Sequence, residues 1–352
     1  MYILLISDNG LGDYFLVRNY FKYFKKSQKY KNHKIIFLAK RDRIDCVKKF
    51  DRDFIDVIIP FSPFKFENNK KYKDRLIDKL KSYDITDIIN VGCAFPEIDN
   101  EPNSTITICN SINAENKIAH AIKPKDEELE RKYSFYTEVI YTPNKDIFEF
   151  QRNKLFFEHL LKIDIKEPEI PYVEFKKSQP DMIIGISPFK RNGYLSWSLD
   201  KWAELADLII DKFQNCRIMI LGTTHDKKHY PKFVNKIKNK HKIINKIGKC
   251  KSSDLPNLIS SLALLISAET ATVHIASAVN IPVVCLSNGA FYKRFHPIPS
   301  DLINYVYPVG FNIWKETYNS GETINKYCYR SPFNLNDVTI DTVYDSALSC
   351  LK

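Results

Sequence analysis

Residues 262–286 constrain the fold of this chain more than any other stretch. Residues 262–266 form an apolar run that is typical of a buried parallel strand, and residues 281–286 predict the next strand. The segment between them, 267–278, is rich in Ala and Ser and predicts one short helix. We therefore expect a parallel α/β sheet, in which ligands bind at the carboxyl ends of the strands.

The start of that helix has the composition of an anion site. Thr270 and His274 are four residues apart and share one helical face. A helix N-terminus attracts phosphate through its free N–H groups, and a histidine one turn later can add a donor. Two structural interpretations stand beside this one. His274 can be a packed core residue, and Glu269 can be a first-turn acid that favours the helix dipole.

The alternation of strands and helices occurs in two halves. A chain of 352 residues exceeds one ordinary core, and prolines between residues 166 and 180 interrupt the periodic pattern. We expect a first Rossmann-like domain at residues 1–175 and a second at 176–335. A terminal helix is expected at 336–352, for which packing back on the first domain is one option.

Several first-half elements follow from the apolar pattern. Residues 2–7 predict a buried strand, and residues 13–26 predict a helix. Residues 105–109 predict another strand, and residues 133–161 predict a helix that is interrupted at Pro143. This alternation is typical of an α/β domain.

Composition limits the partners of the protein. The net charge of +11 favours an anionic partner such as a phosphorylated substrate or a membrane surface, whereas no nucleic-acid-binding motif is present. The sequence contains no apolar run of about 18 residues, and its first residues do not resemble a signal peptide. The eight cysteines are scattered without a Cys-x-x-Cys pair, which predicts reduced thiols in a cytoplasmic protein.

A glycine-rich turn follows the first predicted strand. Gly10 and Gly12 suggest a dinucleotide-binding fingerprint, but Phe15 stands at the third glycine position, so the fingerprint fails. Asp13 lies at the start of the helix that follows. It can act there as a helix cap or as a reactive carboxylate.

Two spacings resemble metal sites without completing one. The Asp51-x-Asp53 pair precedes a predicted strand instead of following one, which favours a solvated turn. His225 and His229 are four residues apart, but no Glu lies between them as a zinc protease requires. We therefore predict no metal site.

The stretch from residue 269 onward resembles the signature of glycosyltransferase family 9, the bacterial lipopolysaccharide heptosyltransferases. The acid, hydroxyl residue, histidine and later proline of that signature correspond to Glu269, Thr270, His274 and Pro282. Glu269 stands where the family usually has Asp, and Ala271 where it usually has Gly. Both departures fall where the backbone would approach a pyrophosphate. The resemblance covers most of the chain, more firmly from 182 to 299.

The resemblance implies a GT-B architecture, in which two Rossmann-like domains face a cleft. It implies inverting transfer of a sugar, with ADP-heptose as the favoured nucleotide-diphosphate sugar donor, onto a lipopolysaccharide or another lipid-linked or cell-surface glycan. No metal and no other cofactor is implied. Asp13 matches the proposed general base of the family, on an acceptor-side loop that also contains Asn9, Gly10 and Gly12.

The resemblance also implies donor contacts from three loops of the second half. Leu195 stands where the family has a Lys two residues before a Trp, here Trp197, so Lys190 or Arg191 is expected to supply the missing charge. Asp226 is expected to accept the ribose hydroxyls, and the basic aromatic segment 290–297 to close over the donor. The predicted donor-binding residues are Ser187, Lys190, Arg191, Asp226, Glu269, Thr270, Ala271 and His274.

Alternatives remain open at this point. Another GT-B enzyme, either a transferase of a different nucleotide sugar or a nucleotide-sugar epimerase, fits the same pattern. A catalytically inactive nucleotide- or glycan-binding protein is consistent with Leu195 and Ala271. A nucleic-acid binder is suggested by charge alone, and we predict no nucleic-acid partner.

One basic segment suggests how the protein reaches a lipid-linked acceptor at a membrane. Residues 21–34 contain six lysines, four aromatic residues and no acid. Lysines are attracted to an anionic surface, and aromatic rings suit the interface. We therefore predict peripheral docking on the inner face of an anionic membrane through the first domain. The alternative is a solvated helix end whose lysines favour the helix dipole.

Overall fold

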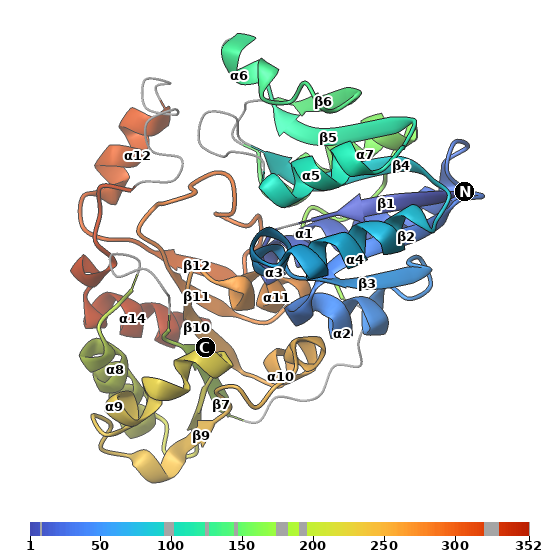
Figure 1. Ribbon diagram of the computed structural model, residues 1–352. Helices are drawn as coiled ribbons and strands as arrows, with labels where there is room; N and C mark the ends of the chain where they lie inside the picture. The colour runs from blue at the N-terminus through green and yellow to red at the C-terminus, as the bar shows by residue number, and fades with distance from the viewer. Residues whose placement is uncertain are drawn as a thin grey trace. The chain divides into compact units, whose positions relative to one another are not determined.

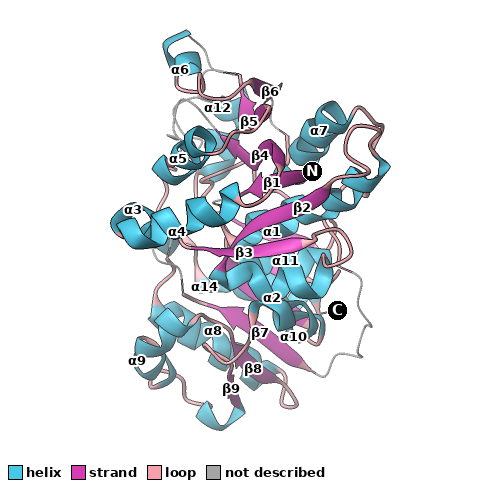
Figure 2. Cartoon of the chain, turned by 45° about the vertical axis from the view of Figure 1, so that its right-hand side comes forward, coloured by secondary structure: helices cyan, strands magenta, loops and turns pink. Residues whose placement is uncertain are grey.

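The computed structural model describes residues 1–7, 9–94, 102–123, 127–143, 147–173, 182–189, 196–319 and 331–351. They form two compact units, Met1–Glu169 and Ile170–Lys352. Each unit is built on a six-stranded parallel sheet with helices on both of its faces (Figures 1 and 2). The predicted α/β fold of two Rossmann-like domains is confirmed.

The first sheet has the strand order β3-β2-β1-β4-β5-β6. The direction in which successive strands are added reverses between β1 and β4, as in a doubly wound α/β sheet. The strands are β1 (Tyr2–Ile6), β2 (Lys34–Lys40), β3 (Val57–Phe61), β4 (Ile85–Ala94), β5 (Asn116–Ile122) and β6 (Glu138–Thr142). Their near-continuous apolar runs are buried on both faces, as a parallel sheet requires.

Helices cover both faces of this sheet. On one face Leu4 and Ile6 pack with apolar residues of α4 and α5. On the other, Phe37 contacts Phe21 of η1, which in turn contacts Phe157 of α7. The helices are α1 (Leu11–Val17), η1 (Arg18–Lys26), α2 (Arg41–Phe50), α3 (Pro63–Asn68), α4 (Lys70–Lys81), α5 (Asn103–Ser111), α6 (Glu127–Arg131) and α7 (Glu149–Leu161).

The second sheet has the order β12-β11-β10-β7-β8-β9, so its growth reverses between β7 and β10. Its strands are β7 (Ile183–Ser187), β8 (Arg217–Ile220), β9 (Ile243–Asn245), β10 (Leu264–Ala268), β11 (Val283–Leu286) and β12 (Ile303–Val306). The α-helices of this unit are α8 (Leu199–Lys212), α9 (Tyr230–Val234), α10 (Leu255–Ser260), α11 (Ala271–Ala278), α12 (Phe311–Asn319) and α14 (Ile340–Cys350). Short 3-10 helices are η3 (Thr224–Lys228), η4 (Lys240–Lys242), η5 (Ser252–Asp254) and η6 (Leu335–Asp337).

The terminal helix α14 packs within the second unit. Val343 and Ala347 are fully buried in the core that α8 shares with the sheet. Trp197 strengthens this connection, because its Nε1 donates to Val338 O at 2.9 Å and its ring meets Trp202 edge-on. Within the second unit, the packing partners of α14 are therefore α8 and β10 to β12.

Two first-half predictions of secondary structure are wrong. Residues 105–109 predicted a strand, but they lie in α5, where Ser104, Thr105, Ile108 and Cys109 are buried at helical spacing. The predicted helix over 133–161 contains strand β6, and only its later part, α7, is helical. The helix predicted at 13–26 is α1 followed by the 3-10 helix η1.

The basic segment 21–34 does not present its aromatic side chains to the surface. Phe21, Tyr23, Phe24 and Tyr30 are all buried, with at most 5% of the side chain exposed. Their rings fill the space between η1, α7 and the sheet, so they cannot enter a membrane interface. The structure therefore contradicts the prediction that these aromatic residues dock on a membrane. Within the described part of the chain, no helix combines the length and hydrophobicity that crossing a bilayer requires.

Candidate active site

The second sheet places its candidate site at the point where its strand order reverses. There β7 and β10 are neighbours, and Ser187 pairs in register with Ser267 at their carboxyl ends. In an open parallel sheet the loops that follow two such strands diverge and leave room for a ligand. Ser187, a predicted donor-binding residue, is 6% exposed at this position.

A cluster of three hydroxyl groups stands at the start of α11. The Oγ1 atoms of Thr270 and Thr272 are 2.7 Å apart, and Ser267 Oγ lies 3.2 and 3.1 Å from them. Thr270 is the N-cap residue, but its side chain accepts no capping hydrogen bond from a backbone N–H of α11. Val273 N donates to Thr270 O at 3.1 Å, which leaves the other N–H groups at the start of α11 for an anion. The phosphate site itself stays a prediction. Ala271 begins the helix and is half-buried.

His274 lies one turn further along α11. Its ring is half-buried and meets Phe295 edge-on at 6.0 Å between centroids. Burial, and then the charge of His296, lower the pKa of His274 from 6.5 to about 4. Its Nδ1 is buried without a hydrogen-bond partner among the described residues. At neutral pH His274 is therefore an uncharged imidazole, which can meet an anion by hydrogen bonding.

Glu269 is joined to the segment that follows β11. Its Oε1 lies 3.1 Å from Nε2 of His296, and the same nitrogen lies 2.6 Å from Ala290 O. Tyr307 OH lies 3.4 Å from the other ring nitrogen. Because Ala290, Tyr292 and His296 are buried, this part of segment 290–297 is built into the fold. His296 is the residue that sequence reasoning missed, since it was noticed only as one member of a basic aromatic segment.

The loops after β7 and β8 contact each other beside this site. A Cβ at Gly222 would lie 3.2 Å from the Phe189 ring and 3.3 Å from Asp226 Oδ2, so a glycine allows this close approach. Asp226 Oδ2 accepts hydrogen bonds from Thr223 N and Oγ1, at 2.6 and 2.7 Å. Its Oδ1 accepts none from any described residue. Lys190, Arg191 and Leu195 lie outside the described residues.

The predicted acceptor-side loop follows β1, next to β4 in the first sheet. Gly10 is the N-cap of α1, and its N–H donates to Asp13 Oδ2 at 2.7 Å. Asp13 therefore acts as a helix cap in this structure, and its role as a base stays a prediction. Asn9 lies against Gly92 of β4, where a Cβ would come within 2.6 Å of Asn9 Nδ2. Gly12 lies in the first turn of α1.

The structure corrects the prediction of a solvated turn at Asp51. Asp51 is 1% exposed, and its Oδ1 accepts from Arg18 Nη2 at 2.7 Å. Tyr14 OH also donates to its Oδ2. Asp53 is exposed, so the two carboxylates do not act as a pair. Among the described residues, no group of three or more His, Cys, Asp and Glu could hold a metal ion.

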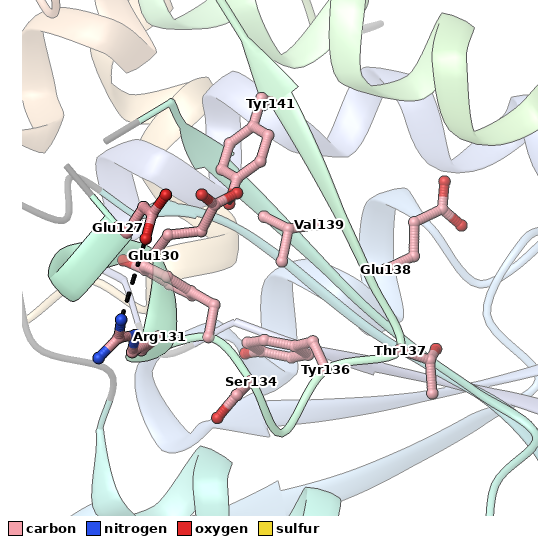
Figure 3. Close-up of a pocket in the computed structure, with 10 residues that line it drawn as sticks. Glu127, Glu130, Arg131, Ser134, Tyr136, Thr137, Glu138, Val139 and Tyr141 are labelled. Atoms are coloured by element: carbon pink, nitrogen blue, oxygen red, sulfur yellow. Dashed lines mark hydrogen bonds and ion pairs between the residues drawn. The ribbon is translucent and has the colours of Figure 1, made fainter. Parts of the chain in front are cut away.

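A hollow of about 530 Å³ lies at the outer edge of the first sheet, between α6 and β6 (Figure 3). Tyr141 OH donates to Glu130 Oε1 at 3.1 Å within it. Burial, and then Glu130, raise the pKa of Tyr141 to about 12. None of the predicted site residues lines this hollow. Its residues belong to α6, the edge strand β6 and the connection between them, and not to the point where the order of the sheet reverses.

Comparison with known proteins confirms the resemblance seen in the sequence. Residues 148–305 match the family described as glycosyltransferase family 9 (heptosyltransferase). The glycosyl transferase family 9 structure from Veillonella parvula is 13% identical, with a TM-score of 0.73 over 99% of this chain and 96% of that chain. E. coli ADP-heptose LPS heptosyltransferase II is 15% identical, with a TM-score of 0.70 over 100% and 98%.

A third similar structure is E. coli heptosyltransferase WaaC with ADP-2-deoxy-2-fluoro heptose. It is 11% identical, with a TM-score of 0.68 over 99% of each chain. A comparison with curated proteins found no match. At such low identities the structures show a shared fold, which is the GT-B fold of the heptosyltransferases.

Proposed function

We propose, starting from the chain's relation to glycosyltransferase family 9, that this protein transfers a sugar from a nucleotide diphosphate to a glycan hydroxyl. ADP-heptose is the favoured donor, since ADP and an ADP-heptose analogue are named with two similar E. coli structures. A lipid-linked or cell-surface glycan is the favoured acceptor. The observation that supports the proposal is the hydroxyl cluster at the start of α11, a helix without a side-chain cap, at the reversal point of the sheet that the family match covers.

The donor half would stabilise the leaving diphosphate without a metal. The first turn of α11 offers backbone N–H groups to the phosphate oxygens, and the Thr270–Thr272 hydroxyl pair lies beside them. His274 would add a hydrogen bond from its neutral ring. Donors that are fixed before the reaction stabilise the charge that develops as the phosphate departs.

The acceptor half would supply the base. In a single displacement, the acceptor oxygen forms a bond to the anomeric carbon while the bond to the diphosphate oxygen breaks, so configuration inverts. The hydroxyl proton passes to Asp13. Oδ2 of Asp13 is used by the N–H of Gly10, and Oδ1 accepts no hydrogen bond from a described residue. Oδ1 is therefore the atom that we propose as the proton acceptor.

Titration calorimetry with ADP, UDP and GDP tests the donor site directly. We expect ADP to bind most tightly, and Thr270→Ala and His274→Ala to weaken its binding. The matched control is His241→Ala, since His241 is an exposed histidine of the same unit. Unchanged ADP affinity in both site variants would return Thr270 and His274 to purely structural roles.

A transfer assay in excess chelator tests the reaction. Release of ADP from ADP-heptose that depends on an acceptor glycan, and that persists in EDTA, supports metal-independent transfer. Loss of transfer in EDTA that Mg²⁺ or Mn²⁺ restores would contradict it. Tight nucleotide binding without transfer to any acceptor would favour an inactive binding protein.

A further inference from the structure

Helix α3 presents an aromatic side chain to solvent. Phe64 is 75% exposed, whereas Phe66, two residues later, is buried in the core of the first unit. Ser62 caps the helix by accepting from Lys65 N, and Pro63 occupies its first turn. The exposure of Phe64 is therefore set by a well-capped helix whose other side is anchored in the core.

Unpaired cations surround this phenylalanine in the sequence. Lys65, Lys70 and Lys71 are exposed, and none of their ammonium groups pairs with a residue that the structure describes. Residues 62–75 hold five cations and only two acids, Glu67 and Asp74. An exposed aromatic ring within a basic stretch is the chemistry that suits an anionic lipid surface.

The basic segment 21–34 differs in both respects. Its aromatic rings are buried, and three of its lysines already have carboxylate partners. Lys22 pairs with Glu167, Lys25 with Asp56 and Lys29 with Asp87. The segment therefore offers a bilayer three exposed lysines outside these pairs, as many as the α3 stretch, but no exposed aromatic ring.

The two segments also lie at opposite edges of the first sheet. The end of segment 21–34 leads into the first residue of β2, so it lies at the amino edge. Helix α3 begins two residues after β3, at the carboxyl edge, where the loop of Asp13 follows β1. Since β3 is two strands from β1 in the sheet, their ends are roughly 10 Å apart.

We propose that Phe64, Lys65, Lys70 and Lys71 form a docking patch for an anionic lipid bilayer. The ring of Phe64 enters the interface, and the lysines meet the lipid phosphates. Docking at the carboxyl edge brings a lipid-linked acceptor to the loop of Asp13, a consequence that rests on the proposed function. Docking at the amino edge would hold that loop away from the bilayer by the length of the strands.

Flotation with vesicles of phosphatidylcholine, with and without 30 mol% (about one lipid in three) phosphatidylglycerol, tests the patch in the full chain. We expect the protein to float only with the anionic vesicles and to be released by salt. Each lysine near such a surface contributes about fivefold to binding. Lys65→Gln, Lys70→Gln and Lys71→Gln together should therefore weaken binding by about a hundredfold.

A matched variant removes the same charge at the other edge. Lys26, Lys31 and Lys34 are exposed and lie in segment 21–34, and their combined change to Gln should leave flotation close to wild type. Phe64→Ala should weaken binding several-fold, and Phe64→Trp should restore it with a blue-shifted tryptophan emission on anionic vesicles. The proposal is overturned if the patch variants float like wild type, or if both lysine triples weaken binding equally.

The same samples separate this proposal from the proposed function. If the protein floats but binds no nucleotide, the docking patch is supported and the transferase assignment is contradicted. If the protein binds ADP but does not float with anionic vesicles, only the docking patch is contradicted. Binding that requires the glycan headgroup of an acceptor lipid would show recognition of the acceptor, and would overturn docking on the lipid surface.

Discussion

Nε2 of His296 lies 3.1 Å from Oε1 of Glu269, which joins the segment after β11 to the residue that precedes α11. Glu269 is 13% exposed and His296 only 2%. Glu269 immediately precedes the N-cap of the helix whose first turn we propose as the anion site. The contact is an ion pair when His296 is protonated, and it lies directly before the backbone that we propose to bind the diphosphate.

Breaking this pair from either side should weaken nucleotide binding to a similar extent. We expect Glu269→Gln and His296→Gln each to weaken ADP binding by about 1 to 2 kcal/mol. The double variant should bind ADP as well as the single variant with the lower affinity, because residues in contact are coupled. Titration calorimetry on all four proteins measures this. Additive effects would mean that the two side chains act independently.

His274 should make stability depend on pH in a defined window. Its pKa is lowered from 6.5 to about 4 by burial and by His296. Between these values the unfolded chain binds a proton that the folded protein does not. The free energy of unfolding should therefore fall as pH drops from 6.5 to 4, by at most about 3 kcal/mol. Denaturant unfolding of wild type and His274→Gln should show the advantage of wild type shrinking over this range.

Diphosphate binding should raise the pKa of His274. An anion beside the ring favours its protonated form, which opposes the effect of burial. The His274 ring signal in an NMR titration with and without ADP measures the direction. An unchanged or lower pKa in the complex would place the diphosphate away from this residue.

Asp13→Asn should abolish transfer and leave ADP affinity close to wild type. A general base contributes about 10²–10⁴-fold to the rate, while Asn keeps an oxygen that can accept from the N–H of Gly10 and preserve the cap. Steady-state transfer and ADP titration on the same preparation separate the two effects. Transfer within tenfold of wild type would leave Asp13 as a helix cap only.

Substitution should lower the stability of the protein strongly at Asp51 and hardly at all at Asp53. Arg18→Ala or Asp51→Ala leaves one buried charge without its partner, which typically costs about 3–5 kcal/mol of stability. Asp53→Ala changes an exposed residue and should stay within about 0.5 kcal/mol. Chemical denaturation compares the three variants. Equal, small effects at both aspartates would contradict the buried pair.

Local patterns in the sequence determined the framework of this protein. The apolar runs at 262–266 and 281–286, with the small-residue helix between them, correspond to β10, β11 and α11. Residues 2–7 correspond to β1 in the same way. Burial of consecutive residues, and the turn residues that bound them, act within a few positions of the chain, so their pattern can be read locally.

Only the tertiary structure decided what lies on each surface and which charges meet. The sequence of segment 21–34 is the same whether its rings face lipid or the core, and the packing of η1 against α7 and the sheet buries them. Asp51 meets Arg18, and Glu269 meets His296, because strand order brings distant loops together. A carboxylate's partner and solvation depend on these long-range contacts, which the local pattern of residues does not encode.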